Sequence, residues 1–212
     1  LVIYLTQHFL FSDEKSTVLY GAYTSLVYVM TIIGGALADR YLGARKAVTF
    51  GAILLVIGHF GMSFEGNGSK QILTLDGVQY EIVLDARGGD ARQQIVTDDG
   101  MSYINFNDSD MLIENPESVG LPESISRDSY TMSVVTEEVY LNILYLSLAF
   151  IIAGVGFLKA NISTIVGSLY GFGDKRRDSG FTIFYMGINL GAFLASIFCG
   201  YLGIVHGWKY GF

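Results

Sequence analysis

The sequence contains few charged residues and almost no cysteine. Asp, Glu, Lys and Arg make up 16% of the 212 residues, whereas 51% are hydrophobic and the mean hydropathy is +0.43. A soluble domain of this length normally carries more charge, so the composition excludes an ordinary soluble protein. The single cysteine, Cys199, excludes a disulfide within the chain and gives no information on the redox compartment.

Residue groupings typical of catalysis and of metal binding are also missing. No nucleophile lies in a recognisable pattern with a base, and no Cys, His or acidic residues have metal-ligand spacing. We therefore expect neither enzyme activity nor a bound metal. The basic run at residues 175–177 fits anchoring at the inner face of a membrane, and we expect no nucleic-acid partner.

Long apolar segments dominate what is present. A helix of about 20 apolar residues spans the ~30 Å hydrocarbon layer of a membrane. Residues 1–11 are interpreted as the end of a further, truncated span, and because neither end looks like a natural terminus we expect the chain to be a fragment. The segments of suitable length and low charge are residues 16–38, 47–64, 139–173 and 179–207.

Charge divides the chain and predicts its orientation. Residues 65–138 hold fifteen acidic and four basic residues, a balance of −11, while the remainder has a balance of +4. The short connections 39–46 and 174–178 hold three bases each, which is typical of cytoplasmic loops. We therefore predict membrane helices in residues 1–64, an extracytoplasmic insert at 65–138, and two more membrane helices in 139–212.

The acidic insert has the pattern of a small β-rich domain. Short runs with alternating apolar residues are separated by turn dipeptides, of which Asp76-Gly77 and Asp99-Gly100 tolerate positive φ angles. Its acidic residues are scattered as on a solvated face, which disfavours a calcium site. The predicted strands are residues 71–75, 79–85, 93–97, 102–107 and 129–136.

The stretch between the second and third predicted helices carries the first resemblance. Gly35, Asp39, Arg40, Gly43 and Arg45 lie in a pattern that resembles the loop signature of the major facilitator superfamily. The glycine removes side-chain bulk so that another helix can approach. The resemblance implies a cytoplasmic gate that holds the outward-open state of a carrier.

Two further stretches are similar to one family within that superfamily. Residues 156–164 (GFLKANIST) and 184–193 (FYMGINLGAF) look like the fourth- and fifth-helix signatures of the proton-dependent oligopeptide transporter family. The first departs at Ala160, where the family usually has proline. Together with Tyr28, the resemblance covers the membrane portion of the chain and none of the insert.

Lys159 is the most informative single residue. A lysine in the middle of an apolar span is unfavourable unless it faces protein, water or a counter-charge. On insertion scales, the free-energy cost of placing a lysine at the centre of a membrane helix is about +2.5–3.5 kcal/mol. Each of three residues lies eleven positions from a residue at the cytoplasmic side, about 16 Å deep at 1.5 Å per residue: Tyr28 from Asp39, Lys159 from Tyr170 and Asn189 from Asp178. The resemblance implies that these three residues contact a peptide, with Lys159 meeting its carboxylate.

The fold class implied is therefore an all-α transmembrane bundle, helices one to five of the major facilitator fold, with a β-rich insert between the third and fourth helices. The resemblance implies proton-coupled symport of di- and tripeptides by alternating access in a plasma or bacterial inner membrane. Partners would be small peptides, protons, membrane lipid and the carboxy-terminal bundle of the full-length protein, with protons as coupling ion and no other cofactor. We expect the fragment alone not to transport.

Two alternatives stay open at this point. The same scaffold could carry another small solute, since the loop signature is shared across the superfamily. A membrane-anchored receptor or adhesion protein acting through the β insert is the other, and it predicts that deleting the insert abolishes function.

Overall fold

A computed structural model describes residues 1–64, 66, 68–85, 92–107 and 110–212. The chain divides into two compact units. Leu1–Tyr4, Asp13–Asn67 and Glu138–Phe212 form the first, called here the helical unit, and Leu5–Ser12 with Gly68–Glu137 form the second, the β unit. The sequence-based boundary instead places residues 5–12 with the helices, and its first insert residue, position 65, lies outside the described residues.

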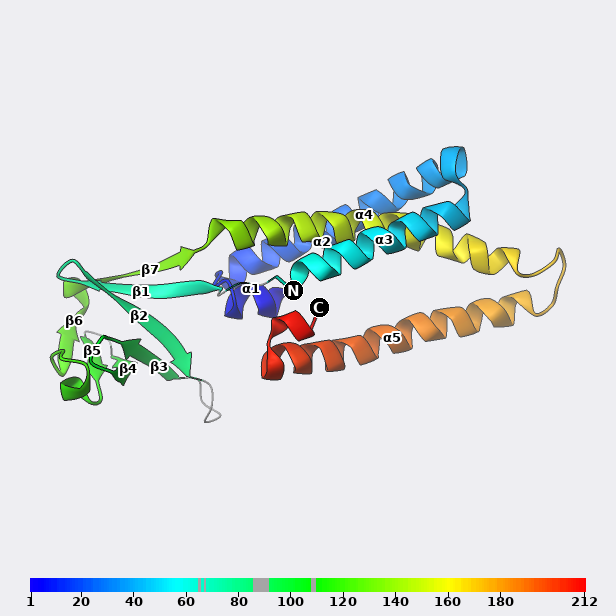
Figure 1. The fold of residues 1–212 in the computed structure, drawn as a ribbon. Helices are drawn as coiled ribbons and strands as arrows, with labels where there is room; N and C mark the ends of the chain where they lie inside the picture. Colours follow the sequence, from blue (N-terminus) through cyan, green and yellow to red (C-terminus); the bar gives the residue numbers. More distant parts are fainter. Residues whose placement is uncertain (65, 67, 86–91, 108–109) are drawn as a thin grey trace. The chain divides into compact units, whose positions relative to one another are not determined.

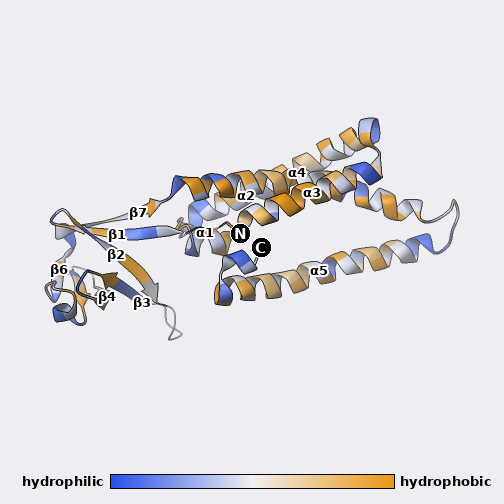
Figure 2. Cartoon of the chain, in the orientation of Figure 1, coloured by the Kyte–Doolittle hydropathy of each residue, from blue (hydrophilic) through white to orange (hydrophobic). Residues whose placement is uncertain are grey.

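The helical unit contains four helices long and apolar enough to cross a membrane, counted over the described residues. Figure 2 shows hydrophobic residues along most of their length. The elements of this part of the chain, in order, are α1 (Val2–Gln7), α2 (Asp13–Leu37), the π-helix η1 (Ala38–Leu42), α3 (Ala44–Met62), α4 (Glu138–Ser168), α5 (Arg177–His206) and the short 3-10 helix η4 (Trp208–Tyr210) (Figure 1).

Most helix ends lie within about three residues of the predicted segments, and two differ by more. The helix at the start of the chain ends at Gln7 rather than continuing to residue 11, because Phe11 N donates to Leu5 O (3.1 Å) and turns the chain back. The α4 helix ends at Ser168 rather than at residue 173. Two glycines follow it, and Gly173 has a φ of 79°, which a helix does not accommodate.

Outside α4, whose buried residues include Leu144 and Phe157, the helical unit buries mostly small residues and exposes many large apolar ones. Helix α2 has only Ser16 and Gly34 buried, while Ile32 is 75% exposed. Helices α2 and α3 both pack against α4, whereas α5 has Gly203 as its one buried residue within the described chain. This distribution suits helices whose outer surfaces face lipid tails or other apolar helices.

The β unit is a seven-stranded antiparallel sheet in the order β6-β5-β4-β3-β2-β1-β7. Alternate residues of every strand point to one face, where buried Leu73, Ile95, Met111 and Ile125 belong to a single apolar cluster. The strands are β1 (Ser69–Leu75), β2 (Val78–Asp85), β3 (Arg92–Val96), β4 (Met101–Phe106), β5 (Asp110–Ile113), β6 (Ser124–Ser126) and β7 (Tyr130–Thr136).

All five predicted strands are present with ends shifted by one or two residues, and the predicted Asp76-Gly77 turn joins β1 to β2. The prediction missed β5 and β6. These strands have four and three residues, too few to display an alternating pattern. Pairing of β5 with β4 and of β6 with β5 supplies what the local sequence does not.

Candidate functional site

Lys159 of α4 lies over the aromatic ring of Tyr28 of α2. The Lys159 Nζ atom is 4.4 Å from the centre of the Tyr28 ring, within the range of a cation–π interaction. The two residues are 131 positions apart in the sequence, so this contact exists only because α2 and α4 pack together. The structure thus brings together two of the three residues predicted to bind substrate.

Glycines allow α2 and α4 to pack closely beside Lys159 and Tyr28. A Cβ atom on Gly156 would lie 2.7 Å from Met30 O, and one on Gly34 would lie 2.6 Å from Gly156 O. Backbone therefore touches backbone about one helical turn from Lys159, as in small-residue interfaces of membrane helices. This contact fixes the level at which the lysine meets the Tyr28 ring.

The ammonium of Lys159 has an aromatic face but no acidic partner. None of the ion pairs formed among the described residues includes Lys159. Its side chain and Tyr28, which is 64% exposed, both remain accessible. Lys159 lies nine residues before the end of α4, about 14 Å along the helix. A cation at that depth without a carboxylate is suited to meet an anionic ligand.

Asn189, the third predicted residue, lies on α5. Its Nδ2 donates to the carbonyl oxygen of Tyr185 in the same helix at 2.9 Å. No hydrogen bond among the described residues joins Asn189 to Lys159 or Tyr28. Its part in a shared site stays a prediction.

The residues of the predicted gate lie in the connection between α2 and α3 and in the adjoining turns of both helices. A Cβ on Gly35 would lie 3.3 Å from Ala160 Cβ, so the motif glycine faces Ala160 of α4. Asp39 and Arg40 lie in the π-helix η1. Its i→i+5 hydrogen bond is donated by Gly43 N to Ala38 O at 2.7 Å. Arg45 follows in the first turn of α3. No ion pair joins Asp39 to Arg45 in the described part of the chain.

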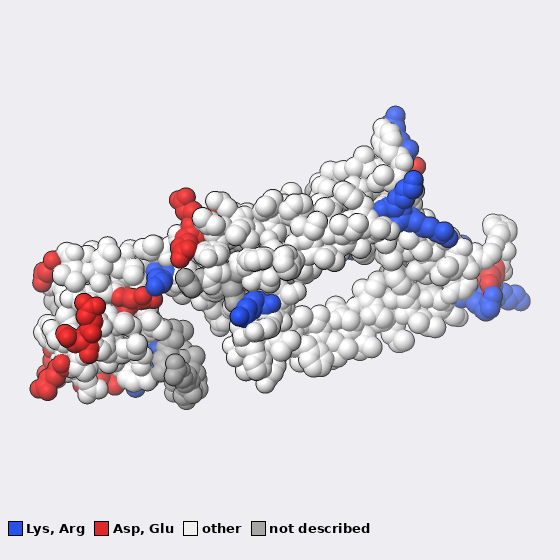
Figure 3. All heavy atoms as spheres, in the orientation of Figure 1, with Lys and Arg blue, Asp and Glu red and all other residues white. Residues whose placement is uncertain are grey.

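The second basic connection contains a defined charge pair. Arg176 donates from its side chain to both carboxylate oxygens of Asp174, at 3.1 and 2.9 Å, and from its backbone N–H at 2.9 Å. The side-chain hydrogen bond from Arg176 and then its backbone hydrogen bond lower the pKa of Asp174 below the ordinary range of aspartate. Figure 3 shows Lys and Arg at this connection and at the one between α2 and α3.

One buried polar side chain near Lys159 was not predicted. Asn161 is 2% exposed, and its Nδ2 donates to the Phe157 carbonyl oxygen at 2.8 Å. The signal in the sequence was an amide within an otherwise apolar run, two residues after the lysine. Its backbone hydrogen bond accounts for the donor that burial would otherwise leave unpaired.

A model described as the POT family matches residues 45–212 of this chain. Among curated relatives, the chain is 28% identical over 199 residues to the peptide transporter YePEPT of Yersinia enterocolitica, an alignment covering 94% of the chain and 25% of that protein. It is 31% identical over 202 residues to the uncharacterized transporter YclF of Bacillus subtilis, covering 95% of the chain and 26% of that protein.

Solved structures give the same result. The chain matches a mutant of a peptide transporter POT, crystallised with alafosfalin, with a TM-score of 0.63 and 28% identity. The match covers all of this chain and 30% of that one. The chain thus spans about a quarter of the length of the curated relatives it matches.

Proposed function

Because the chain belongs to the POT family, a family of transporters, we propose that the protein of which it forms part carries short peptides across a membrane together with protons. The chain is part of a multi-pass membrane protein. Peptide substrates, proton coupling and alternating access are the proposal. Protons are the only coupling species it requires, and the protein is a carrier rather than an enzyme.

The contact between Lys159 and Tyr28 is the observation that supports this proposal most. A short zwitterionic peptide carries a carboxylate, and Lys159 offers an ammonium inside an apolar span with no acidic partner among the described residues. An ion pair formed away from bulk water is stronger than one at the surface. The Tyr28 ring holds the ammonium in place before the substrate arrives.

Asn189 and the gate residues have supporting parts in this proposal. Asn189 would offer its amide to the peptide backbone once α5 is packed in the complete protein. The basic connections would lie in the cytoplasm, since both carry Lys and Arg in short loops between spans. The β unit would then lie outside the plasma or bacterial inner membrane.

Gradient-driven uptake of a labelled dipeptide by the full-length protein in proteoliposomes tests the proposal. We expect Lys159→Ala to abolish accumulation while the protein still inserts normally. Lys175→Ala is the matched control, because it removes a lysine from the connection between α4 and α5 and leaves the spans unchanged. Full accumulation by Lys159→Ala would refute the assigned role of the lysine, and absence of dipeptide uptake by wild type would refute the proposed function.

A further inference from the structure

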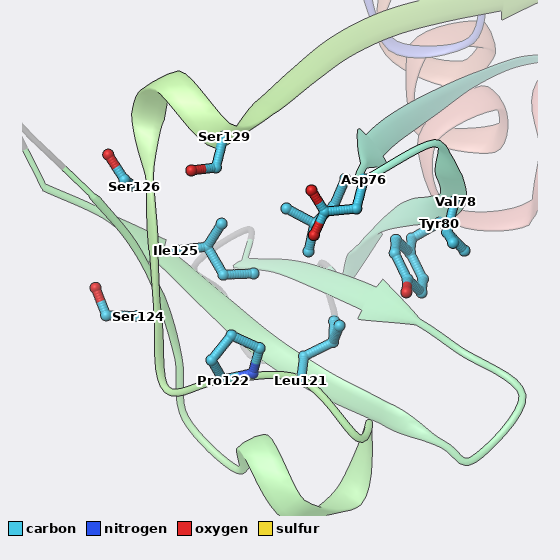
Figure 4. A pocket seen from close by; sticks show the side chains of 10 residues that line it. Asp76, Val78, Tyr80, Leu121, Pro122, Ser124, Ile125, Ser126 and Ser129 are labelled. Carbon is cyan, nitrogen blue, oxygen red and sulfur yellow. The ribbon is translucent and has the colours of Figure 1, made fainter.

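A pocket of about 450 Å³ lies in the β unit, far in sequence from Lys159 and Tyr28. One side is formed by the β1–β2 turn with Asp76 and Tyr80, and the other by β6 and the segments beside it (Figure 4). Strands β6 and β1 are not neighbours in the sheet order, yet residues of both line the pocket. The sheet therefore curves until β6 approaches the β1–β2 turn. A volume of this size accommodates a small ligand.

The described lining of the pocket combines apolar surface with a negative charge. Leu75, Leu121, Pro122 and Ile125 provide apolar surface, and no Lys or Arg is among the described residues that line the pocket. Among these described lining residues, Asp76 alone carries a charge. The remaining polar residues of the lining are Tyr80, Ser124, Ser126 and Ser129, and Figure 4 shows the side chains of Ser124 and Ser126 on the opposite side of β6 from Ile125. A ligand that carries a cation and an apolar group matches this lining.

The nearest base along the chain, Arg127, is not among the described residues that line the pocket, and its side chain contacts Tyr130. Arg127 donates to the Tyr130 hydroxyl at 3.0 Å and lies over that ring at 5.3 Å from its centre. Figure 3 shows acidic side chains spread over the β unit. A cationic group is therefore favoured both by Asp76 and by the surrounding charge.

The strand beside the pocket has a free edge. Ile113 N donates to Glu123 O at 2.9 Å, and the register pairs Met111 with Ile125. Because hydrogen-bonded pairs alternate along antiparallel strands, the N–H and C=O groups of Ser124 and Ser126 point away from β5. Outside helices and strands, no backbone hydrogen bond of the described chain uses the N–H or C=O of Ser124 or the N–H of Ser126. The C=O of Ser126 lies at the start of the 3-10 helix Arg127–Ser129, and both serines line the pocket.

We propose that this pocket of the β unit binds the amino-terminal end of a short extended peptide. Asp76 receives the terminal ammonium, the apolar walls receive the first side chain, and the outer edge of β6 pairs with the peptide backbone. Strand addition of this kind derives affinity from main-chain hydrogen bonds and specificity from side-chain pockets. The site is separate from Lys159 and does not depend on the proposed transport.

The tripeptide Leu-Ala-Ala and its N-acetylated form are the probes. Binding is measured by calorimetry on the purified chain in detergent, in a Lys159→Ala background that removes the other candidate site. We expect the free amine to bind at least about tenfold more tightly than the acetylated peptide, since a hydrogen bond to a charged group contributes about 1.5–3 kcal/mol. Equal binding of the two peptides, or no binding of either, would overturn the proposal.

Two variants separate the parts of the site. Asp76→Asn keeps the turn, because asparagine tolerates the φ of 50° at this position, and should reduce the preference to less than about threefold. Asp98→Asn is the matched control, an exposed aspartate outside the pocket, and should keep the preference. An unchanged preference in Asp76→Asn would contradict the assigned role of the carboxylate.

Ser126→Pro tests the strand edge without breaking the sheet. Ser126 has a φ of −61°, which proline adopts, and its N–H points away from β5. Removing this donor should weaken binding of both peptides by about fivefold, equivalent to one backbone hydrogen bond. Circular dichroism checks that the sheet is retained, and undiminished binding by a folded variant would contradict strand addition.

Discussion

The two units of this chain place their apolar residues in opposite ways. In the β unit the large apolar side chains are inside, and Leu73, Ile95 and Met111 are fully buried. In the helical unit they are largely outside, as Ile32 and Phe60 are 75% and 66% exposed. Glycines such as Gly34 and Gly156 occupy the helix contacts instead.

This difference shows what holds each unit together. Water drives the β unit to bury its apolar side chains. Lipid gives the helices no such drive, so their association depends on close packing at small residues. The same packing brings Lys159 over Tyr28, whereas in the β unit the pocket arises where the curved sheet does not close.

The same substitution in the two units sharpens the comparison most. Ile95→Ala should lower the unfolding free energy of the β unit by about 3 kcal/mol, because it leaves a cavity in a packed core. Ile32→Ala should change that of the helical unit by less than about 0.5 kcal/mol, since its side chain is exposed. Hydrogen exchange of the chain in detergent resolves the two units. Similar losses at both positions would contradict the contrast.

Adding a methyl group at a helix contact has the next largest effect. Gly156→Ala should destabilise the packing of α2 on α4 by about 2 kcal/mol, because its Cβ would clash with Met30 O. Gly187→Ala on α5 meets no atom within 4 Å and should stabilise its helix by up to about 1 kcal/mol. Exchange rates in α2, α4 and α5 measure both effects. Stabilisation by Gly156→Ala would show that the contact is looser than described.

The smallest effect is expected at the exposed connection between α4 and α5. Arg176 holds the pKa of Asp174 below its ordinary value, so the pair contributes stability above the unfolded pKa of about 3.9 and loses it as the pH falls through the lowered folded value. In Arg176→Gln, NMR titration should find the pKa of Asp174 returned toward its ordinary range, whereas Lys175→Gln should retain most of the depression. If the pKa of Asp174 did not change in Arg176→Gln, the hydrogen bonds from the Arg176 side chain could not be the cause of the lowered pKa.

Much of the fold was predictable because both units follow simple periodic rules. Length and charge predicted the four long apolar helices, and alternation with Asp-Gly turns predicted five strands. The short strands β5 and β6 could not be predicted, since pairing with a neighbour rather than local pattern forms them. The π-helix at Ala38–Leu42 was expected only as a loop, because its sequence is also that of a charged turn.

The candidate site was predictable to a lesser degree. Lys159 could be predicted because a lysine within an apolar span is unusual. Its predicted depth in the membrane equals that of Tyr28. Spacing along a helix does not determine which way a side chain faces, so the contact between Lys159 and Tyr28 required the packed helices. The pocket at Asp76 could not be predicted at all, because it joins strands separated by about fifty residues.

Selectivity for a peptide carboxylate tests the central claim most directly. Binding of Ala-Ala and of its C-terminal amide is compared in the full-length protein, for wild type, Lys159→Gln and the control Lys175→Gln. We predict that wild type and the control prefer the free carboxylate by at least about tenfold, and that Lys159→Gln loses this preference. A preference that survives in Lys159→Gln would mean that another residue meets the carboxylate and would contradict the account.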